Sequence, residues 1–389
     1  MQELLWLLLP VAAFSGWWAA RRSERRRRDC LHPELSSGYF QGLNYLLNEQ
    51  PDKAIEVFIR MLEVNSETVE THLALGNLFR RRGEVDRAIH IHQNLIARPT
   101  LSARQRSHAL LELGQDYMRA GLLDRAENLF GELVEDPDHG HAALQQLLVI
   151  YQQEKDWDKA IQIARRLAST NGRHLNPMIA QFYCERAEEA VGHGDEAEAR
   201  QMLKRALAQD RDCVRASLLQ GDMAREAGDC KAAIRAYRRV ENQDIDFLPE
   251  VIRPLGECYQ NLGKADDLQR WLETVLHQYG GVSPVLALAD LIVKTRGEAA
   301  GIEFITEQQR RRPSLRGLSR LISMNLSGAA EGPARDNLLI LKGLTDRLLT
   351  DKPVYRCHAC GFNGKTLHWQ CPGCKEWNTV KPIYGVEGE

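Results

Sequence analysis

Small residues recur through the middle of this 389-residue chain at intervals close to 34 positions. The intervals between successive alanines are 34, 38, 34, 39 and 34 residues, and these alanines stand at positions 54, 88, 126, 160, 199 and 233. In most of these segments another small residue precedes the alanine by twelve positions, as Gly76 precedes Ala88. A repeat of this length indicates units that bury their apolar faces only by stacking on one another.

The apolar residues within each unit have helical spacing. Ile55, Phe58 and Leu62 lie three or four positions apart, which is typical of one face of a helix. We find no alternation typical of strands between residues 35 and 350. Each unit resembles a tetratricopeptide repeat, in which two antiparallel helices cross most closely at their small residues. We therefore expect an all-α fold, a tetratricopeptide-repeat superhelix with closing helices over residues 35–350.

Two Cys-x-x-Cys pairs lie close together near the carboxyl end. Cys357 and Cys360 form the first pair, and Cys371 and Cys374 follow after ten intervening residues. This spacing places four thiolates within reach of one tetrahedral metal ion. Disulfides would need an oxidising compartment, and a redox Cys-x-x-Cys normally occurs once, near a βαβ pattern. We therefore predict one iron or zinc ion bound by all four cysteines, in a small rubredoxin-like or zinc-ribbon domain over residues 351–389.

Metal binding is expected to stabilise this module, because about thirty residues cannot build a core of their own. The protein fills all four coordination positions, which leaves no open position for a substrate. Iron in the same cage could instead exchange electrons, and this alternative stays open. We also expect Tyr355, Trp369 and Trp377 to pack the ribbon against itself and against the last helices.

An uncharged stretch lies near the start of the chain. Residues 4–20 carry no charge, and a helix of that length extends for about 26 Å, at the short end of what spans a bilayer. Six arginines between 21 and 28 follow it, against the single Glu24. Positive charge after an apolar run, rather than before it, argues against a cleaved signal peptide. By the positive-inside rule we expect a single-pass anchor at 1–20 with its amino end outside, a basic linker at 21–34 and a cytoplasmic body.

Small residues recur every four positions within the predicted anchor, at Ala12, Gly16 and Ala20. Such a ridge would let a second transmembrane helix approach closely, although small residues are also common in membrane helices in general. We name these three residues as a candidate helix interface.

The remaining sequence favours binding over catalysis. It contains no metalloprotease His-Glu-x-x-His and no nucleophile elbow. Residues 361–366 resemble a phosphate loop, but they lack its first glycine and its flanking strand and helix. We therefore predict that the protein is not an enzyme. The net charge is −2, and the body without its arginine cluster has no basic face suited to nucleic acid.

We then expect the function to lie in the groove of the repeats. On the first helix of each unit, the residues next to the recurring small residue are expected to face this concave surface. The candidate partner-binding residues at these positions are Asn77, Arg80, Arg81, Gln115, Arg119, Asp222 and Arg225. The alternative is that these polar side chains only keep a long helical body in solution.

From end to end, the chain resembles the lipopolysaccharide assembly protein B family of Gram-negative inner-membrane proteins. The most specific segments are LLWLLLPVAAFSGWW at the start, LALGNLFRRRGEVDRAIHIHQNL at 73–95, and YRCHACGF with HWQCPGCKEWNTVKPI at the end. The resemblance implies a single inner-membrane anchor with a periplasmic amino end, cytoplasmic tetratricopeptide repeats, and a rubredoxin-like ribbon whose metal ligands are the four cysteines.

The resemblance also implies the role of an adaptor. The family promotes degradation of the deacetylase that commits material to lipid A synthesis. The degrading enzyme is the membrane AAA+ metalloprotease FtsH, and an inner-membrane regulator of lipopolysaccharide synthesis restrains the adaptor. Two alternatives are an electron-transfer protein with an iron-loaded ribbon and a general assembly scaffold for envelope enzymes. Ten residues between the cysteine pairs are too few for the full sheet of a true rubredoxin, which weakens the electron-transfer alternative.

Overall fold

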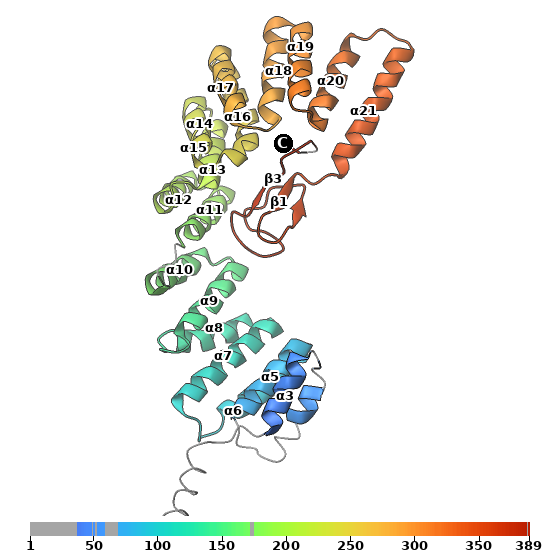
Figure 1. Ribbon diagram of the computed structural model, residues 1–389. Helices are drawn as coiled ribbons and strands as arrows, with labels where there is room; N and C mark the ends of the chain where they lie inside the picture. The colour runs from blue at the N-terminus through green and yellow to red at the C-terminus, as the bar shows by residue number, and fades with distance from the viewer. Residues whose placement is uncertain (1–36, 49, 51–52, 59–68, 172–174, 387) are drawn as a thin grey trace, which may run out of the picture. The chain divides into compact units, whose positions relative to one another are not determined.

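A computed structural model describes residues 37–48, 50, 53–58, 69–171, 175–386 and 388–389 (Figure 1). Helices make up most of this part of the chain, and a small three-stranded sheet lies near its carboxyl end. The predicted helical-repeat fold with a terminal four-cysteine ribbon is confirmed. The chain divides into two compact units, one that ends at Ile150 and one that begins at Tyr151.

The first unit contains α3 (Ser37–Leu47), α5 (Val69–Arg82), α6 (Val85–Ile96), α7 (Ala103–Ala120), α8 (Leu123–Leu133) and most of α9 (Gly140–Glu154). The helices of the second unit are α10 (Trp157–Asn171), α11 (Asn176–Gly192), α12 (Glu196–Gln209), α13 (Val214–Glu226), α14 (Cys230–Tyr237), α15 (Val240–Gln243), the 3₁₀-helix η1 (Ile245–Phe247), α16 (Leu248–Asn261), α17 (Ala265–Gln278), α18 (Ser283–Arg296), α19 (Glu298–Arg311), α20 (Leu315–Gly328) and α21 (Pro333–Asp351). Its strands are β1 (Tyr355–Cys357), β2 (Asn363–Gly364) and β3 (Val380–Pro382).

Consecutive helices pack in pairs joined by short turns. Helix α5 packs on α6 and α7 on α8, and in the second unit α11 packs on α12 and α13 on α14. The turn after α7 depends on Gly121, which has a left-handed backbone (φ 75°) and whose N–H donates to the carbonyl oxygens at the end of α7. A residue without a Cβ adopts this conformation at little cost. The chain can therefore reverse within two residues and lay α8 against α7.

In four helix pairs, a glycine on the first helix packs against a ring from the second helix. The ring belongs to the residue sixteen positions after the glycine. A Cβ added to Gly114 would lie 2.5 Å from the Phe130 ring, and one added to Gly221 would lie 2.3 Å from the Tyr237 ring. Gly42 meets Phe58 and Gly76 meets His92 in the same way. The six alanines that define the repeat are all 0 % exposed. The small residues therefore mark the closest approach between helices, as the spacing predicts.

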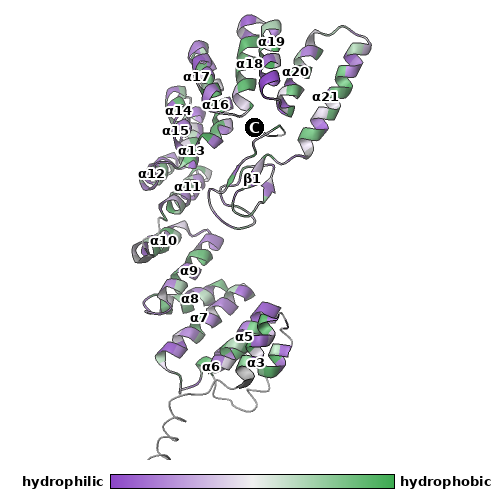
Figure 2. Cartoon of the chain, in the orientation of Figure 1, coloured by the Kyte–Doolittle hydropathy of each residue, from purple (hydrophilic) through white to green (hydrophobic). Residues whose placement is uncertain are grey.

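Hydrophobic and hydrophilic residues alternate along the helices of both units, as amphipathic packing requires (Figure 2). Among the described residues, no helix is long and apolar enough to cross a membrane. The predicted anchor at 1–20, its candidate interface at Ala12, Gly16 and Ala20, and the basic linker at 21–34 all lie outside the described residues.

We expect Gly114→Ala to destabilise the protein, because the added methyl group overlaps the Phe130 ring in a packed interface. The cost should be about 1–3 kcal/mol, typical of overpacking. Gly131→Ala is the matched control, since nothing lies within 4 Å of its added Cβ and alanine favours a helix by up to about 1 kcal/mol. Urea unfolding followed by circular dichroism measures both variants. Equal effects of the two substitutions would contradict close packing at Gly114.

Candidate metal centre

The four cysteines of the ribbon lie on two tight loops at one end of a small antiparallel sheet. The strand order is β2-β1-β3, with Cys357 opposite Val380 in the β1–β3 pair. Gly361 follows the first cysteine pair with a left-handed backbone (φ 78°). In the second loop, a Cβ added to Gly373 would lie 3.3 Å from Cys360 Sγ. These two glycines let both loops turn their sulfur atoms toward one point.

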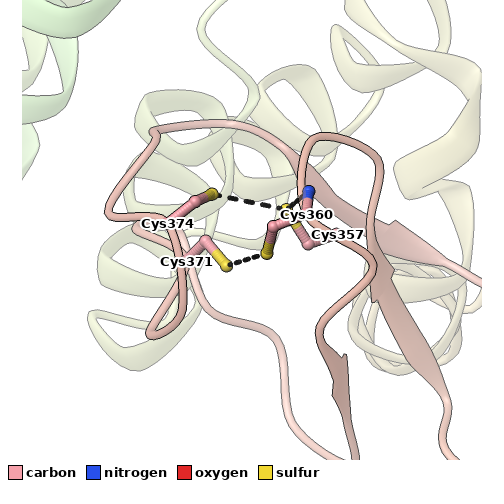
Figure 3. Close-up of side chains that lie close together, drawn as sticks. All are labelled: Cys357, Cys360, Cys371 and Cys374. Atoms are coloured by element: carbon pink, nitrogen blue, oxygen red, sulfur yellow. Dashed lines mark hydrogen bonds between the residues drawn. The ribbon is translucent and has the colours of Figure 1, made fainter. Parts of the chain in front are cut away.

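The sulfur atoms have the spacing of a tetrahedral metal site (Figure 3). All four lie within 4.8 Å of one another. Cys357 Sγ lies 3.7 Å from Cys374 Sγ, and Cys360 Sγ lies 3.6 Å from Cys371 Sγ. Metal–sulfur bonds of about 2.3 Å in a tetrahedron place sulfurs about 3.8 Å apart. The donor set therefore fits one iron or zinc ion, and the four predicted ligands are brought together.

The surroundings of the thiols shift the pKa values of Cys357 and Cys374 in opposite directions. A hydrogen bond with the Thr379 hydroxyl, 3.2 Å from the sulfur, lowers the pKa of Cys357 to about 6. The backbone N–H of Glu376 lowers the pKa of Cys374, but desolvation and the neighbouring sulfurs outweigh it and raise that pKa to about 12. Four thiolates repel one another at this spacing, and a divalent or trivalent ion would supply the charge that keeps all four deprotonated.

Burial of the sulfurs is uneven. Cys357 and Cys371 are 1 % and 0 % exposed, whereas Cys360 is exposed and Cys374 half-buried. One side of the site faces the core of the ribbon, where Val380 and Phe362 pack, and the other side faces solvent.

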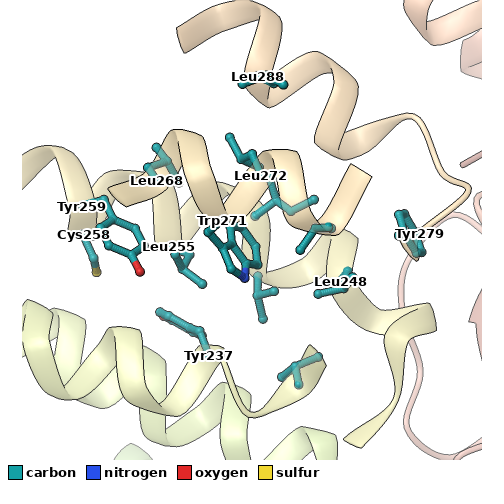
Figure 4. Close-up of a cluster of buried hydrophobic side chains, with 14 of the residues drawn as sticks. Tyr237, Leu248, Leu255, Cys258, Tyr259, Leu268, Trp271, Leu272, Tyr279 and Leu288 are labelled. Carbon is teal, nitrogen blue, oxygen red and sulfur yellow. The ribbon is translucent and has the colours of Figure 1, made fainter. Parts of the chain in front are cut away.

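The ribbon docks on helices of the second unit through aromatic side chains. Trp377 lies edge-on to Trp157 of α10 and Phe182 of α11, with ring centroids 6.3 and 5.8 Å apart. Trp369 stacks on Phe247 of η1 at 5.4 Å. With Leu367, it packs against the hydrophobic cluster that includes Tyr237, Leu255 and Trp271 (Figure 4). Tyr355 donates its hydroxyl to Glu250 of α16 at 2.5 Å. The expectation that these aromatics pack on the last helices is therefore wrong, because their partners lie on α10, α11, η1 and α16.

Polar contacts fix the orientation of the docked ribbon. Lys381 forms ion pairs with Asp244 at 2.9 Å and Asp246 at 2.8 Å. Gln181 of α11 donates to Asn378 at 2.8 Å, and Trp377 Nε1 donates to Gln152 at 3.0 Å. The amides and the ion pairs can be satisfied together in only one orientation, so they select one arrangement of the ribbon on the repeats.

Arg215 is a structural residue that sequence reasoning missed. Its side chain is nearly buried, forms ion pairs with Glu185 and Glu188 of α11, both at 2.8 Å, and lies 5.9 Å from the Trp369 ring centroid. It therefore links α11, α13 and the ribbon. In the sequence, an arginine at this position cannot be told from the many solvated arginines around it.

The candidate groove residues are divided between the two units. Asn77, Arg80 and Arg81 lie on α5, Gln115 and Arg119 on α7, and Asp222 and Arg225 on α13. Arg81 and Arg119 are exposed, Gln115 is half-buried, and Asn77 has a buried Oδ1 with no hydrogen-bond partner. Asp222 accepts from the Tyr237 hydroxyl at 2.7 Å, and Arg225 pairs with Asp222 and Glu257, both at 3.6 Å.

Arg80 belongs to a buried ionic network between α5, α6 and α7. It pairs with Glu112 at 2.6 Å and with Asp116 at 2.8 Å, and Asp116 lies 2.5 Å from Nδ1 of the fully buried His92. Burial alone would raise the pKa of Glu112, but hydrogen bonds from His108 and Arg80 lower it to about 2. Arg80 therefore links consecutive helix pairs within the first unit.

Antiparallel helix pairs that carry a docked four-cysteine ribbon define a tetratricopeptide-repeat protein with a rubredoxin-type metal-binding domain. A family model for the rubredoxin metal binding domain matches residues 355–382. A tetratricopeptide repeat model matches residues 40–100, 111–173 and 184–246. The chain is 42 % identical over 388 residues to "Lipopolysaccharide assembly protein B" of Escherichia coli (strain K12), with 100 % of both chains covered. It is 37 % identical over 396 residues to the protein of that name from Haemophilus influenzae, again with 100 % of both covered. The chain belongs to the lipopolysaccharide assembly protein B family.

We expect Cys371→Ser to abolish metal binding and release the ribbon, because three thiolates and a hydroxyl do not complete the tetrahedral cage. Metal analysis of the purified protein should show loss of the ion, and tryptophan emission should shift to the red as Trp369 and Trp377 become hydrated. Cys230→Ala, a buried cysteine outside the ribbon, is the control and should keep its metal. Unchanged metal content in Cys371→Ser would contradict the ligand assignment.

We expect Arg80→Ala to destabilise the first unit by about 3–5 kcal/mol, since it removes the arginine that two buried carboxylates share. Arg119→Ala, at an exposed position on α7, should change stability by no more than about 0.5 kcal/mol.

The pKa of Glu112 lies below its ordinary value of 4.5, so the stability that this carboxylate contributes is fully present above about pH 4.5 and is lost as the pH falls toward 2. Without Arg80 that pKa should rise, and acid unfolding should begin at a higher pH. An unchanged acid-unfolding profile would exclude this pairing.

Proposed function

We propose that this protein is a non-enzymatic, membrane-tethered adaptor in lipopolysaccharide assembly. The observation that carries the proposal is the full-length similarity to relatives named lipopolysaccharide assembly protein B, together with repeats whose usual role is to bind other proteins. The metal cage supports a structural role for the ribbon, because four protein ligands leave no open coordination position for a substrate.

In the specific form of the proposal, the adaptor presents the committed lipid A deacetylase to the membrane AAA+ metalloprotease FtsH. An inner-membrane regulator of lipopolysaccharide synthesis restrains the adaptor. Ala12, Gly16 and Ala20 of the anchor are candidate contacts for a second transmembrane helix. The anchor at 1–20 would hold the adaptor in the inner membrane with its amino end in the periplasm. Confinement to one bilayer raises the effective concentration of adaptor and protease without new contacts.

The first unit offers the more accessible part of the proposed partner-binding surface. Ribbon side chains contact α10, α11, η1 and α16 in the second unit. Arg81 and Arg119 on α5 and α7 are exposed, so their guanidinium groups are available to a bound segment.

We expect deletion of residues 1–20 to leave a folded body that no longer directs turnover of the deacetylase. Pulse-chase measurement of the deacetylase half-life in cells should give a longer half-life with the truncated protein. A chimera with an unrelated transmembrane helix separates simple tethering, which it restores, from specific recognition by the anchor, which it does not. A normal half-life with the soluble fragment would rule out the tether.

Electron transfer is a second candidate, favoured by the exposure of Cys360 on the outer side of the metal site. An exposed ligand residue would shorten the path to a redox partner if the ion is iron. The zinc-loaded protein distinguishes the two functions, since zinc does not change its oxidation state. Full activity with zinc supports the adaptor, and loss of activity with an intact fold supports electron transfer.

A further inference from the structure

An arginine-lined cavity of about 490 Å³ lies between α12, α13 and α14 in the second unit. Arg200 comes from α12, Arg235 from α14, and Arg239 from just beyond the end of α14. Gln220 and Met223 of α13 also line the cavity, and alanines of α13 and α14 complete the lining. In Figure 1, α12 and α14 lie on the side of α11 and α13 that faces away from the ribbon. The cavity is therefore separate from the metal centre and from the surface on which the ribbon docks.

The positive charge of this cavity is poorly compensated. None of the described residues that line it carries a carboxylate. Arg200 pairs with Glu196 at 3.2 Å, but both side chains are more than half exposed, and such surface pairs contribute little. Arg235 is exposed, and Arg239 is half-buried with a hydrogen bond to the Gln220 amide oxygen at 2.5 Å.

Arg239 differs from the buried Arg215 of the same unit. Burial alone would lower the pKa of Arg215, but Glu185 and Glu188 raise it. Burial lowers the pKa of Arg239, and no carboxylate in the described part of the chain opposes this effect. A guanidinium that is partly desolvated beside a neutral amide is stabilised when an anion enters.

We propose that this cavity binds the phosphate group of a small organic phosphate. Guanidinium groups match phosphate oxygens in pairs of parallel hydrogen bonds, and three arginines suit the double charge of a phosphate monoester better than the single charge of a carboxylate. The volume lies in the range of small-molecule sites and exceeds what a bare phosphate ion needs. Met223 and the alanines would contact the organic part of the ligand. This site goes beyond the adaptor function, which requires no small molecule.

The phosphate group could belong to a soluble monoester or to a lipid head group, and calorimetry on the full-length protein can separate these sources. The probes are phenyl phosphate, a neutral phenol control, and dihexanoyl phosphatidic acid, a short-chain lipid that is soluble as a monomer. We expect phenyl phosphate to bind and phenol not to bind, with affinity that falls as salt is added. Tighter binding of the short-chain lipid would identify a head group as the natural ligand, and weaker binding would identify a soluble ester.

Arg239→Gln and Arg235→Gln should each weaken phosphate binding by about tenfold or more, the effect of losing one charge-assisted contact. Arg205→Gln is the matched control, because Arg205 is an exposed arginine of α12 outside the cavity. Arg235 is exposed, so its replacement should leave the fold unchanged, which circular dichroism verifies. Absence of binding to both phosphate probes would overturn the proposal, as would equal affinity in all three variants.

Discussion

Four helix pairs of this protein depend on the close approach of a glycine to a ring. The glycine on the first helix leaves space that Phe58, Phe130 or Tyr237 fills from the second helix, and the recurring alanine of the same pair is fully buried. Because packed interiors tolerate neither voids nor overlap, this contact fixes the separation of the two helices. The separation in turn determines which side chains of these pairs reach the next pair.

The ribbon and the repeats of the second unit stabilise each other. The ribbon has three short strands and a small cluster around Cys357, Cys371 and Val380, which is too little apolar area to fold independently. A metal ion would fix its loops, and the repeats supply the surface that covers its tryptophans. In return Trp377 covers Trp157 and Phe182 at the junction of α10 and α11. Metal binding and the integrity of this surface are therefore linked.

The sequence predicts those features that repeat or that have fixed chemical spacing. The alanines that recur every 34 to 39 residues identify the helical repeats, and the two cysteine pairs identify the metal ligands, because both patterns reflect local geometry. Contacts between residues far apart in sequence have no such signature. Nothing in the repeat pattern indicates that Trp369 stacks on Phe247, or that Arg80 forms ion pairs with Glu112 and Asp116 in the next helix pair. These contacts depend on how successive elements stack, which the period alone does not specify.

Substitution within one repeat shows how such a fold acquires polar features without losing its packing. His92 occupies the position of Phe58, Phe130 and Tyr237, with its ring against Gly76, so it fills the same volume while adding two nitrogen atoms. One of them pairs with Asp116, which in turn holds Arg80. An imidazole in place of the aromatic ring thus adds a polar contact with Asp116, and the ion pair between Asp116 and Arg80 extends the link to a third helix. Because the link is buried, its geometry is fixed as firmly as the packing it replaces, and the exposed arginines beside it are positioned on a rigid surface.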